Sequence, residues 1–327
     1  MIIDLPNTNT QEISKALVRI RDLGGQVSTS RVLTLIAQLE ASDDIASIVR
    51  AASEASREHP SRVIILVHHE HREPGEPEID GSKIDAEVRI GGDAGASEMI
   101  IIHLYGDVVR HQLNVVMPLL LPDTPIVAWW PFKAPVDTAA DPIGSIAQRR
   151  ITDMTAGHSS DALYNRRNNY HPGDSDLAWA RLTPWRGVVA SALDQPPLAE
   201  VTAAKVSGFS DCPSADLAAA WLSARLGTEV QRSSIGQGAV AFDESGLSTI
   251  PVATLEFTTT RGTITITAGE DEQTIEVRAY DHAPALVAVS RRSEADCLAE
   301  ELRHLDPDVA YAGALRSLDR VQFSIDA

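Results

Sequence analysis

The chain has only two cysteines, Cys212 and Cys297, among its 327 residues. They lie far apart, and neither belongs to a CxxC pair or to a metal-binding spacing. Few and distant thiols favour a reducing cytoplasm over a disulfide framework, although the sequence leaves a single bridge between the two open. We therefore expect a cytoplasmic protein whose fold depends on its core.

Long apolar runs and an excess of positive charge are lacking as well. Runs such as Val115–Leu121 are far shorter than the roughly 20 apolar residues that span a bilayer. No basic segment followed by an apolar one opens the chain, so no secretory signal is predicted. The net charge of −18 argues against binding to nucleic acid or to anionic membranes. The net charge does not argue against a protein partner, because docking depends on the charge of the contacting surface.

Patterns typical of catalysis and of metal binding are also missing. In His68-His-Glu-His71 the side chains alternate between the faces of a predicted strand end, so at most two converge and a solvated strand end is favoured. Gly91–Gly95 lacks the lysine and the following helix of a phosphate loop. No Gly-x-Ser-x-Gly elbow and no full dinucleotide fingerprint occur. We predict no catalytic residue, no metal and no cofactor, and hence no enzyme.

What the chain does contain is a concentration of tryptophan. Aromatic residues make up 5% of the chain, yet four of its five tryptophans lie between Trp129 and Trp185. Residues 143–190 also hold six arginines against four aspartates, a basic island in an acidic chain. Trp and Arg are enriched at the energetic centres of interfaces, so a recognition surface is indicated. A core position is the alternative, and at least one of Trp129 and Trp130 should face inward on its strand.

Hydrophobic periodicity predicts the organisation of the first two thirds of the chain. Residues 1–60 are predicted to be a helical segment, with helices starting near Thr10, over 32–39 and at Asp43 or Asp44. Residues 61–195 place buried strands around a helix over 107–121 that Pro118 interrupts. This order predicts an α/β domain with a mixed or parallel sheet. The domain carries the basic island of residues 143–190, which we call the Trp/Arg-rich segment. Trp179 and Trp185 are expected on two consecutive helices separated at Thr183-Pro184.

A second domain is predicted after Gln195-Pro-Pro197, the strongest linker signal in the chain. Residues 196–327 contain an Ala-rich helix over 213–226, a series of short strands and two final helices. Thr260-Arg-Gly262 separates two alternating β-branched runs, which predicts a hairpin. The expected architecture is α+β, with a largely antiparallel sheet.

Three phrases of the sequence resemble the bacterial glucose-6-phosphate dehydrogenase assembly protein family, OpcA. They are Ser61-Arg-Val-Ile64, Pro125-Ile-Val-Ala-Trp-Trp-Pro131 and, above all, the stretch from Gly173 to Arg186 that reads GDSDLAWARLTPWR. The resemblance covers most of the chain. It implies a non-enzymatic partner that helps the dehydrogenase form an active oligomer, supporting the oxidative pentose phosphate pathway and NADPH supply. A thioredoxin-linked redox control, found in some relatives, is not expected with only two cysteines that lack a paired spacing.

We therefore predict an assembly factor and allosteric activator that docks on the dehydrogenase through its Trp/Arg-rich segment. The predicted contact residues are Arg166, Arg167, Tyr170, Trp179, Arg181, Trp185 and Arg186. Replacing Trp179 or Arg181 by Ala is expected to weaken stimulation and to leave the protein folded. The alternative is a sensing domain in which the arginines bind a sugar phosphate or nucleotide and the tryptophans stack on it.

Overall fold

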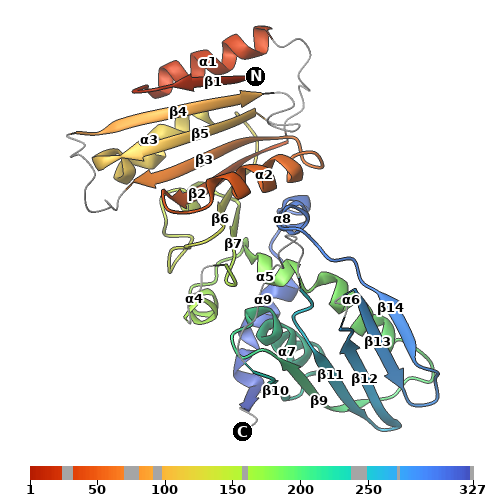
Figure 1. The fold of residues 1–327 in the computed structure, drawn as a ribbon. Helices are drawn as coiled ribbons and strands as arrows, with labels where there is room; N and C mark the ends of the chain where they lie inside the picture. Colours follow the sequence, from red (N-terminus) through yellow and green to blue (C-terminus); the bar gives the residue numbers. More distant parts are fainter. Residues whose placement is uncertain are drawn as a thin grey trace. The chain divides into compact units, whose positions relative to one another are not determined.

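The computed structural model describes residues 1–23, 32–69, 81–90, 98–156, 161–236, 249–270 and 273–324. The chain forms two compact units, drawn in Figure 1. The first contains residues 1–153 and 298–307, and the second contains residues 154–297 and 308–327. Each unit is thus built from two separate stretches of the sequence. None of the helices described is long and apolar enough to cross a membrane.

A mixed sheet forms the centre of the first unit, with its strands in the order β1-β4-β5-β3-β2-β6-β7 (Figure 1). Strands β5, β3, β2, β6 and β7 run parallel to one another, whereas β4 is antiparallel to both β5 and β1. The α/β architecture predicted from the sequence is confirmed. The strands are β1 (Ile2–Leu5), β2 (Leu33–Glu40), β3 (Ser61–His69), β4 (Lys83–Ile90), β5 (Glu98–Tyr105), β6 (Ile126–Trp130) and β7 (Arg149–Thr152).

Two helices of the first unit begin where the sequence predicts them. Helix α1 (Thr10–Leu23) buries Ile13 and Leu17 in the core, and α2 (Ile45–Ala55) begins at Asp44, whose side chain accepts a hydrogen bond from the Ser47 N–H. The predicted helix over 107–121 is divided at its proline, as expected. Its parts are η2 (Gly106–His111), α3 (Gln112–Val116) and η3 (Met117–Leu119), and a short η4 (Gly144–Ile146) follows β6.

The helix predicted over residues 32–39 is wrong, because this segment is strand β2. Its first seven residues are buried, and it pairs with β3 on one side and β6 on the other. A strand buried on both faces carries a continuous apolar run, which periodicity alone cannot separate from a helix. Residues 1–60 are therefore not a helical segment: they supply β1 and β2 to the sheet.

The second unit contains a sheet in the order β14-β13-β12-β11-β9-β10-β15. Its pairs are antiparallel except β10 with β9 and β10 with β15, so the largely antiparallel α+β prediction is confirmed, as is the hairpin of β11 and β12. Residues 239–242, expected from the sequence as one of the short strands of this domain, lie outside the described residues. The strands are β9 (Val201–Gly208), β10 (Val230–Ser234), β11 (Thr254–Thr259), β12 (Gly262–Ala268), β13 (Thr274–Ala279), β14 (Ala285–Ala288) and β15 (Val321–Ser324).

Helices and one further short strand complete the second unit. Helix α7 ends at Gly227, whose φ of +70° suits a residue without a side chain. The elements are α4 (Ala162–Asn168), β8 (Asp174–Asp176), α5 (Leu177–Ala180), α6 (Thr183–Leu193), α7 (Pro213–Leu226), α9 (Val309–Arg316) and η5 (Leu318–Arg320). Helix α8 (Glu294–Arg303) begins in the second unit and ends in the first.

The chain leaves the first unit earlier than the linker signal suggests. The sequence places residues 61–195 in one domain and 196–327 in another, whereas residues 154–195 belong to the second compact unit. The physical reason is burial: α5 and α6 contribute Trp179, Trp185 and Val189 to the core of that unit. The Gln195-Pro-Pro197 stretch therefore connects elements within one unit.

Candidate partner-binding site

The predicted contact residues lie near one another in the sequence, but most of them are buried in the interior of the second unit. Trp179 and Trp185 are 1% and 2% exposed, and Arg181 and Arg166 are 5% and 8% exposed. The expectation that the tryptophans form an exposed surface is therefore wrong. Arg167 is exposed, whereas Tyr170 and Arg186 are partly buried. Trp129 and Trp130, of which at least one was expected inside, are both buried in the first unit.

Trp179 is held by polar and aromatic contacts from α6 and α9. Its indole N–H donates to Oδ2 of Asp308 at 2.7 Å. The Arg186 guanidinium carbon lies 3.7 Å from the centroid of the indole, a close cation–π contact. The Tyr311 ring lies 5.9 Å from the indole. An aromatic ring with a buried N–H needs such a partner, and here Asp308 supplies it.

The charged residues around Trp179 are also directed inward. Asp176 caps α5 by accepting from the N–H of Ala178 at 2.8 Å. Arg181 Nη1 donates to Thr155 Oγ1 at 3.2 Å, and Arg186 Nη2 donates to Thr183 Oγ1 at 2.7 Å. The side chain of Thr183 thus accepts a bond from Arg186, and the N-cap residue of α6 is Leu182.

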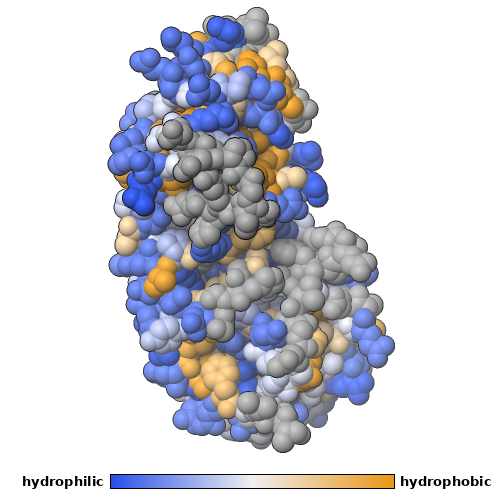
Figure 2. Space-filling model, turned by 60° about the vertical axis from the view of Figure 1, so that its left-hand side comes forward, coloured by the Kyte–Doolittle hydropathy of each residue, from blue (hydrophilic) through white to orange (hydrophobic). Residues whose placement is uncertain are grey.

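Arginines of the basic island are buried in the first unit as well. Arg149 forms a buried ion pair with Glu301, and Arg150 donates to the carbonyl of Ala147 at 3.0 Å. Four of the six arginines of the basic island are therefore buried: Arg149, Arg150, Arg166 and Arg181. The positive charge that the sequence suggests for docking is largely internal. Hydrophilic side chains predominate on the face drawn in Figure 2, where apolar ones form small patches.

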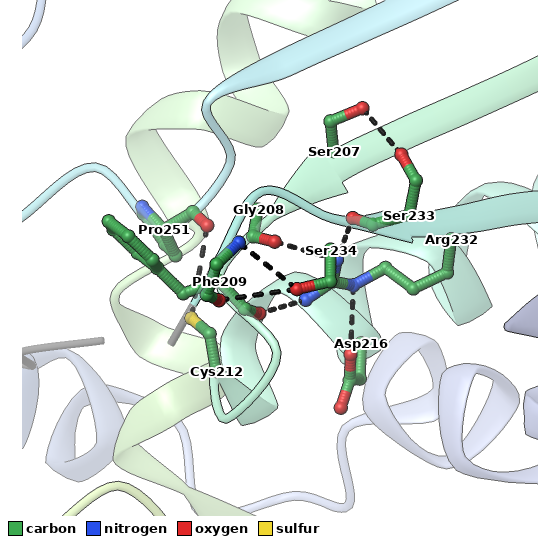
Figure 3. Close-up of polar contacts among 10 residues, drawn as sticks. Ser207, Gly208, Phe209, Cys212, Asp216, Arg232, Ser233, Ser234 and Pro251 are labelled. Carbon is green, nitrogen blue, oxygen red and sulfur yellow. Dashed lines mark hydrogen bonds and ion pairs between the residues drawn. The ribbon is translucent and has the colours of Figure 1, made fainter. Parts of the chain in front are cut away.

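A polar cluster that the sequence analysis missed surrounds Arg232, at the carboxyl ends of β9 and β10 (Figure 3). The Arg232 Nε donates to Asp216 Oδ1 at 2.9 Å. Its remaining donors reach the backbone carbonyls of Gly208, Phe209 and Ser233. The cluster was missed because β10 itself was not predicted. Its donors reach Asp216 of α7 and backbone oxygens at the strand ends, so it ties the strand ends to α7.

Burial changes the acidity of two groups in this cluster. It raises the pKa of Asp216 to about 6, because the loss of water outweighs the attraction of Arg232. Burial also raises the pKa of the Cys212 thiol, whose sulfur lies 3.8 Å from the Pro251 carbonyl oxygen. A thiol held protonated is a poor nucleophile.

The histidine-rich stretch lies at the end of β3 in the first unit. His69 Nε2 lies 3.0 Å from His103 Nδ1, and the His69 ring stacks on Tyr105. His68 Nε2 lies 3.0 Å from Gln112 Oε1. Burial lowers the pKa of His103. Within the described residues no three His, Cys, Asp or Glu side chains are placed to hold a metal; Glu70, His71 and Gly91–Gly95 lie outside them.

An apolar groove of about 260 Å³ lies beside α6 in the second unit. It is lined by Pro184, Gly187, Val188, Ser191, Ala192, Gln195, Val277, Ala285 and Val287. Next to it, and sharing Pro184, is a recess of about 20 Å³ lined in part by Arg181, Trp185 and Arg291. That recess has room for about one water molecule and is too small for the sugar phosphate of the sensing alternative.

The sequence matches two family models. One, described as the glucose-6-phosphate dehydrogenase subunit N-terminal domain, matches residues 52–168, and the corresponding C-terminal domain matches residues 172–315. A comparison with curated proteins gives no match.

Two solved structures are similar to this chain at low identity. One is a 3-ketoreductase from Actinomadura kijaniata in complex with TDP-benzene and NADP, with 11% identity, 90% of this chain and 100% of that chain covered, and a TM-score of 0.42. The other is the UDP-N-acetylglucosamine 3-dehydrogenase of Acidithiobacillus ferrooxidans, with 8% identity, 88% and 97% covered, and a TM-score of 0.35. At these TM-scores the similarities carry no argument about function.

Proposed function

Because this chain belongs to the glucose-6-phosphate dehydrogenase assembly protein family, OpcA, we propose that it is a non-enzymatic subunit that binds glucose-6-phosphate dehydrogenase and supports its active oligomer. The observation that carries the proposal is the pair of family matches, which together run from residue 52 to residue 315. Such a protein would act in the cytoplasm, where the oxidative pentose phosphate pathway supplies NADPH.

Activation follows from differential binding. A subunit that binds the active oligomer more tightly than the inactive enzyme shifts the population toward the active form. Coupling energies of about 1–3 kcal/mol are typical and correspond to changes of roughly 5-fold to 150-fold. No side chain of this subunit then needs to touch the reacting atoms.

The burial of the Trp/Arg-rich segment changes the role that we propose for it. Trp179, Arg181 and Trp185 support the docking surface from inside and do not form it. Of the predicted contact residues, Arg167 remains accessible on α4, close to Tyr164, which is 68% exposed. We assign these two side chains to the outer surface available to a partner.

Size-exclusion chromatography of the two mixed proteins, with a dehydrogenase assay of each fraction, tests the proposal. We expect the chain and the enzyme to co-elute as a larger species with raised activity. Separate elution and unchanged activity over a concentration series would refute it. Calorimetry of the isolated chain with glucose 6-phosphate and with NADP tests the sensing alternative, which requires tight binding in the absence of the enzyme.

A further inference from the structure

Strand β14 forms one edge of the second unit's sheet, and no described strand pairs with its outer side. Its register with β13 determines which backbone groups face outward. Val287 is opposite Ile275, and the Val289 N–H donates to the carbonyl of Gln273 at 2.8 Å. Hydrogen-bonded pairs alternate along an antiparallel ladder, so Ala285 and Val287 also bond to β13. The N–H and C=O groups of Leu286 and Ala288 therefore point away from the sheet.

The apolar groove lies directly beside this open edge. Ala285 and Val287, whose side chains share one face of β14, line one wall together with Val277 of β13. Val188 and Ala192 of α6 line the opposite wall. Leu286 points to the other face of the sheet and is 74% exposed. An open strand edge beside an apolar groove is the arrangement by which sheets bind extended peptides: main-chain bonds give affinity, and alternate side chains enter the groove.

The charge at one end of the groove indicates the chemistry of the peptide. The small recess that shares Pro184 with the groove is lined in part by Arg291. Helix α6 also begins at this end, and its dipole adds positive potential there. Arg291 is only partly buried, three residues beyond the end of β14. An acidic side chain is therefore favoured at this end, and apolar side chains are favoured along the groove.

We propose that an extended segment of the dehydrogenase adds to β14 as a further strand, with apolar side chains at alternate positions in the groove and an acidic side chain near Arg291. This inference rests on the proposed function and adds the binding mode. A residue of that segment opposite Val287 would place its side chain on the groove face. The exposed backbone of β14 would gain partners at Leu286 and Ala288.

The first test removes one outward N–H. Leu286→Pro deletes a donor that does not bond to β13, in an edge strand where proline is tolerated. Leu286→Ala keeps the donor and removes the same exposed side chain, so it is the matched control. We expect Leu286→Pro to weaken binding of the purified dehydrogenase by about tenfold and Leu286→Ala by less than about twofold, both measured by biolayer interferometry.

The second test fills the groove without changing the strand. A Cβ added at Gly187 has no atom within 4 Å, so Gly187→Leu should fold normally, and it also raises helix propensity. Its longer side chain should occupy the groove and weaken dehydrogenase binding by about tenfold. Gly187→Ala adds a single methyl group and serves as the control, with binding close to that of the unmodified chain.

Amide hydrogen exchange gives a readout at single residues. In the complex, exchange at Leu286 and Ala288 should slow, whereas Ala285 and Val287 already bond to β13 and should change little.

If the unmodified chain binds the dehydrogenase and both test variants bind like their controls, the groove assignment is overturned and the proposed function stands. If the unmodified chain does not bind, the proposed function itself fails. Loss of self-association in Leu286→Pro with intact dehydrogenase binding would assign the edge to a second copy and overturn the proposal.

Discussion

The indole N–H of Trp179 donates to Oδ2 of Asp308 at 2.7 Å, across 129 residues of sequence. The other carboxylate oxygen, Oδ1, accepts from the N–H groups of Ala310 and Tyr311 in the first turn of α9. One carboxylate thus caps a helix and satisfies a buried indole. This contact places Trp179 in the structural core of the second unit, where α5, α6 and α9 meet.

Trp179→Ala should lower the free energy of unfolding by about 3–5 kcal/mol, because it opens a cavity and leaves Asp308 without its indole donor. Guanidinium denaturation measures the change. Arg167→Ala is the control from the same segment; its side chain is exposed, and the expected change is within about 0.5 kcal/mol. Equal stability of the two variants would contradict the core assignment.

The buried ion pair of Arg62 and Glu98 gives a second prediction for the first unit. Arg62 Nη2 lies 2.7 Å from Glu98 Oε2, and Arg62 Nη1 donates to the Leu119 carbonyl at 2.6 Å. Glu98→Gln should cost about 3–5 kcal/mol, because it leaves a buried guanidinium without its counter-charge. The double change Arg62→Met with Glu98→Leu should cost less than Glu98→Gln alone. Thermal unfolding of the three proteins tests the order, and a larger loss in the double variant would count against it.

Asp216 should make stability depend on pH in a direction unusual for an aspartate. Its folded pKa of about 6 lies above its ordinary value of 3.8, so the folded state holds the proton more tightly. The contribution of Asp216 to the free energy of unfolding is complete below about pH 4 and is lost as pH rises to about 6. Asp216→Asn stays neutral and keeps an acceptor for Arg232. From pH 4 to pH 7, the unmodified chain should therefore lose at most about 3 kcal/mol relative to this variant.

Urea unfolding of both proteins at a series of pH values measures that difference. The comparison removes the titration of groups that the two proteins share. A difference in stability that stays constant with pH, or that grows in favour of the unmodified chain as pH rises, would show that folding does not raise the pKa of Asp216.

The two thiols should be unreactive in the folded protein. Cys212 and Cys297 are buried and are not joined by a disulfide, and burial raises the pKa of Cys212. Because the thiolate is the reactive form, iodoacetamide should modify both slowly in native buffer and rapidly in denaturant. Mass spectrometry counts the labels. Rapid native labelling, or fewer than two free thiols after unfolding, would be inconsistent with this arrangement.

Much of the fold was predictable because the signals for it are local. The Asp44 cap of α2, the division of the helix at Pro118 and the hairpin around Arg261 each depend on residues within one or two turns of the chain. Strand β2 was misassigned because its burial on both faces depends on β3 and β6. Strands β10 and β15 were missed because they are short and carry polar residues.

The sequence by itself determined the fold classes of the two units and the family, since these depend on local patterning and on the phrase from Gly173 to Arg186. Only the tertiary structure decided that Trp179 is buried, because the residues that contact it include Asp308 and Tyr311, more than a hundred positions away. It also decided where an open surface remains. The outer edge of β14 and the groove beside α6 exist only once the strand and the helix pack together, and no local pattern specifies that.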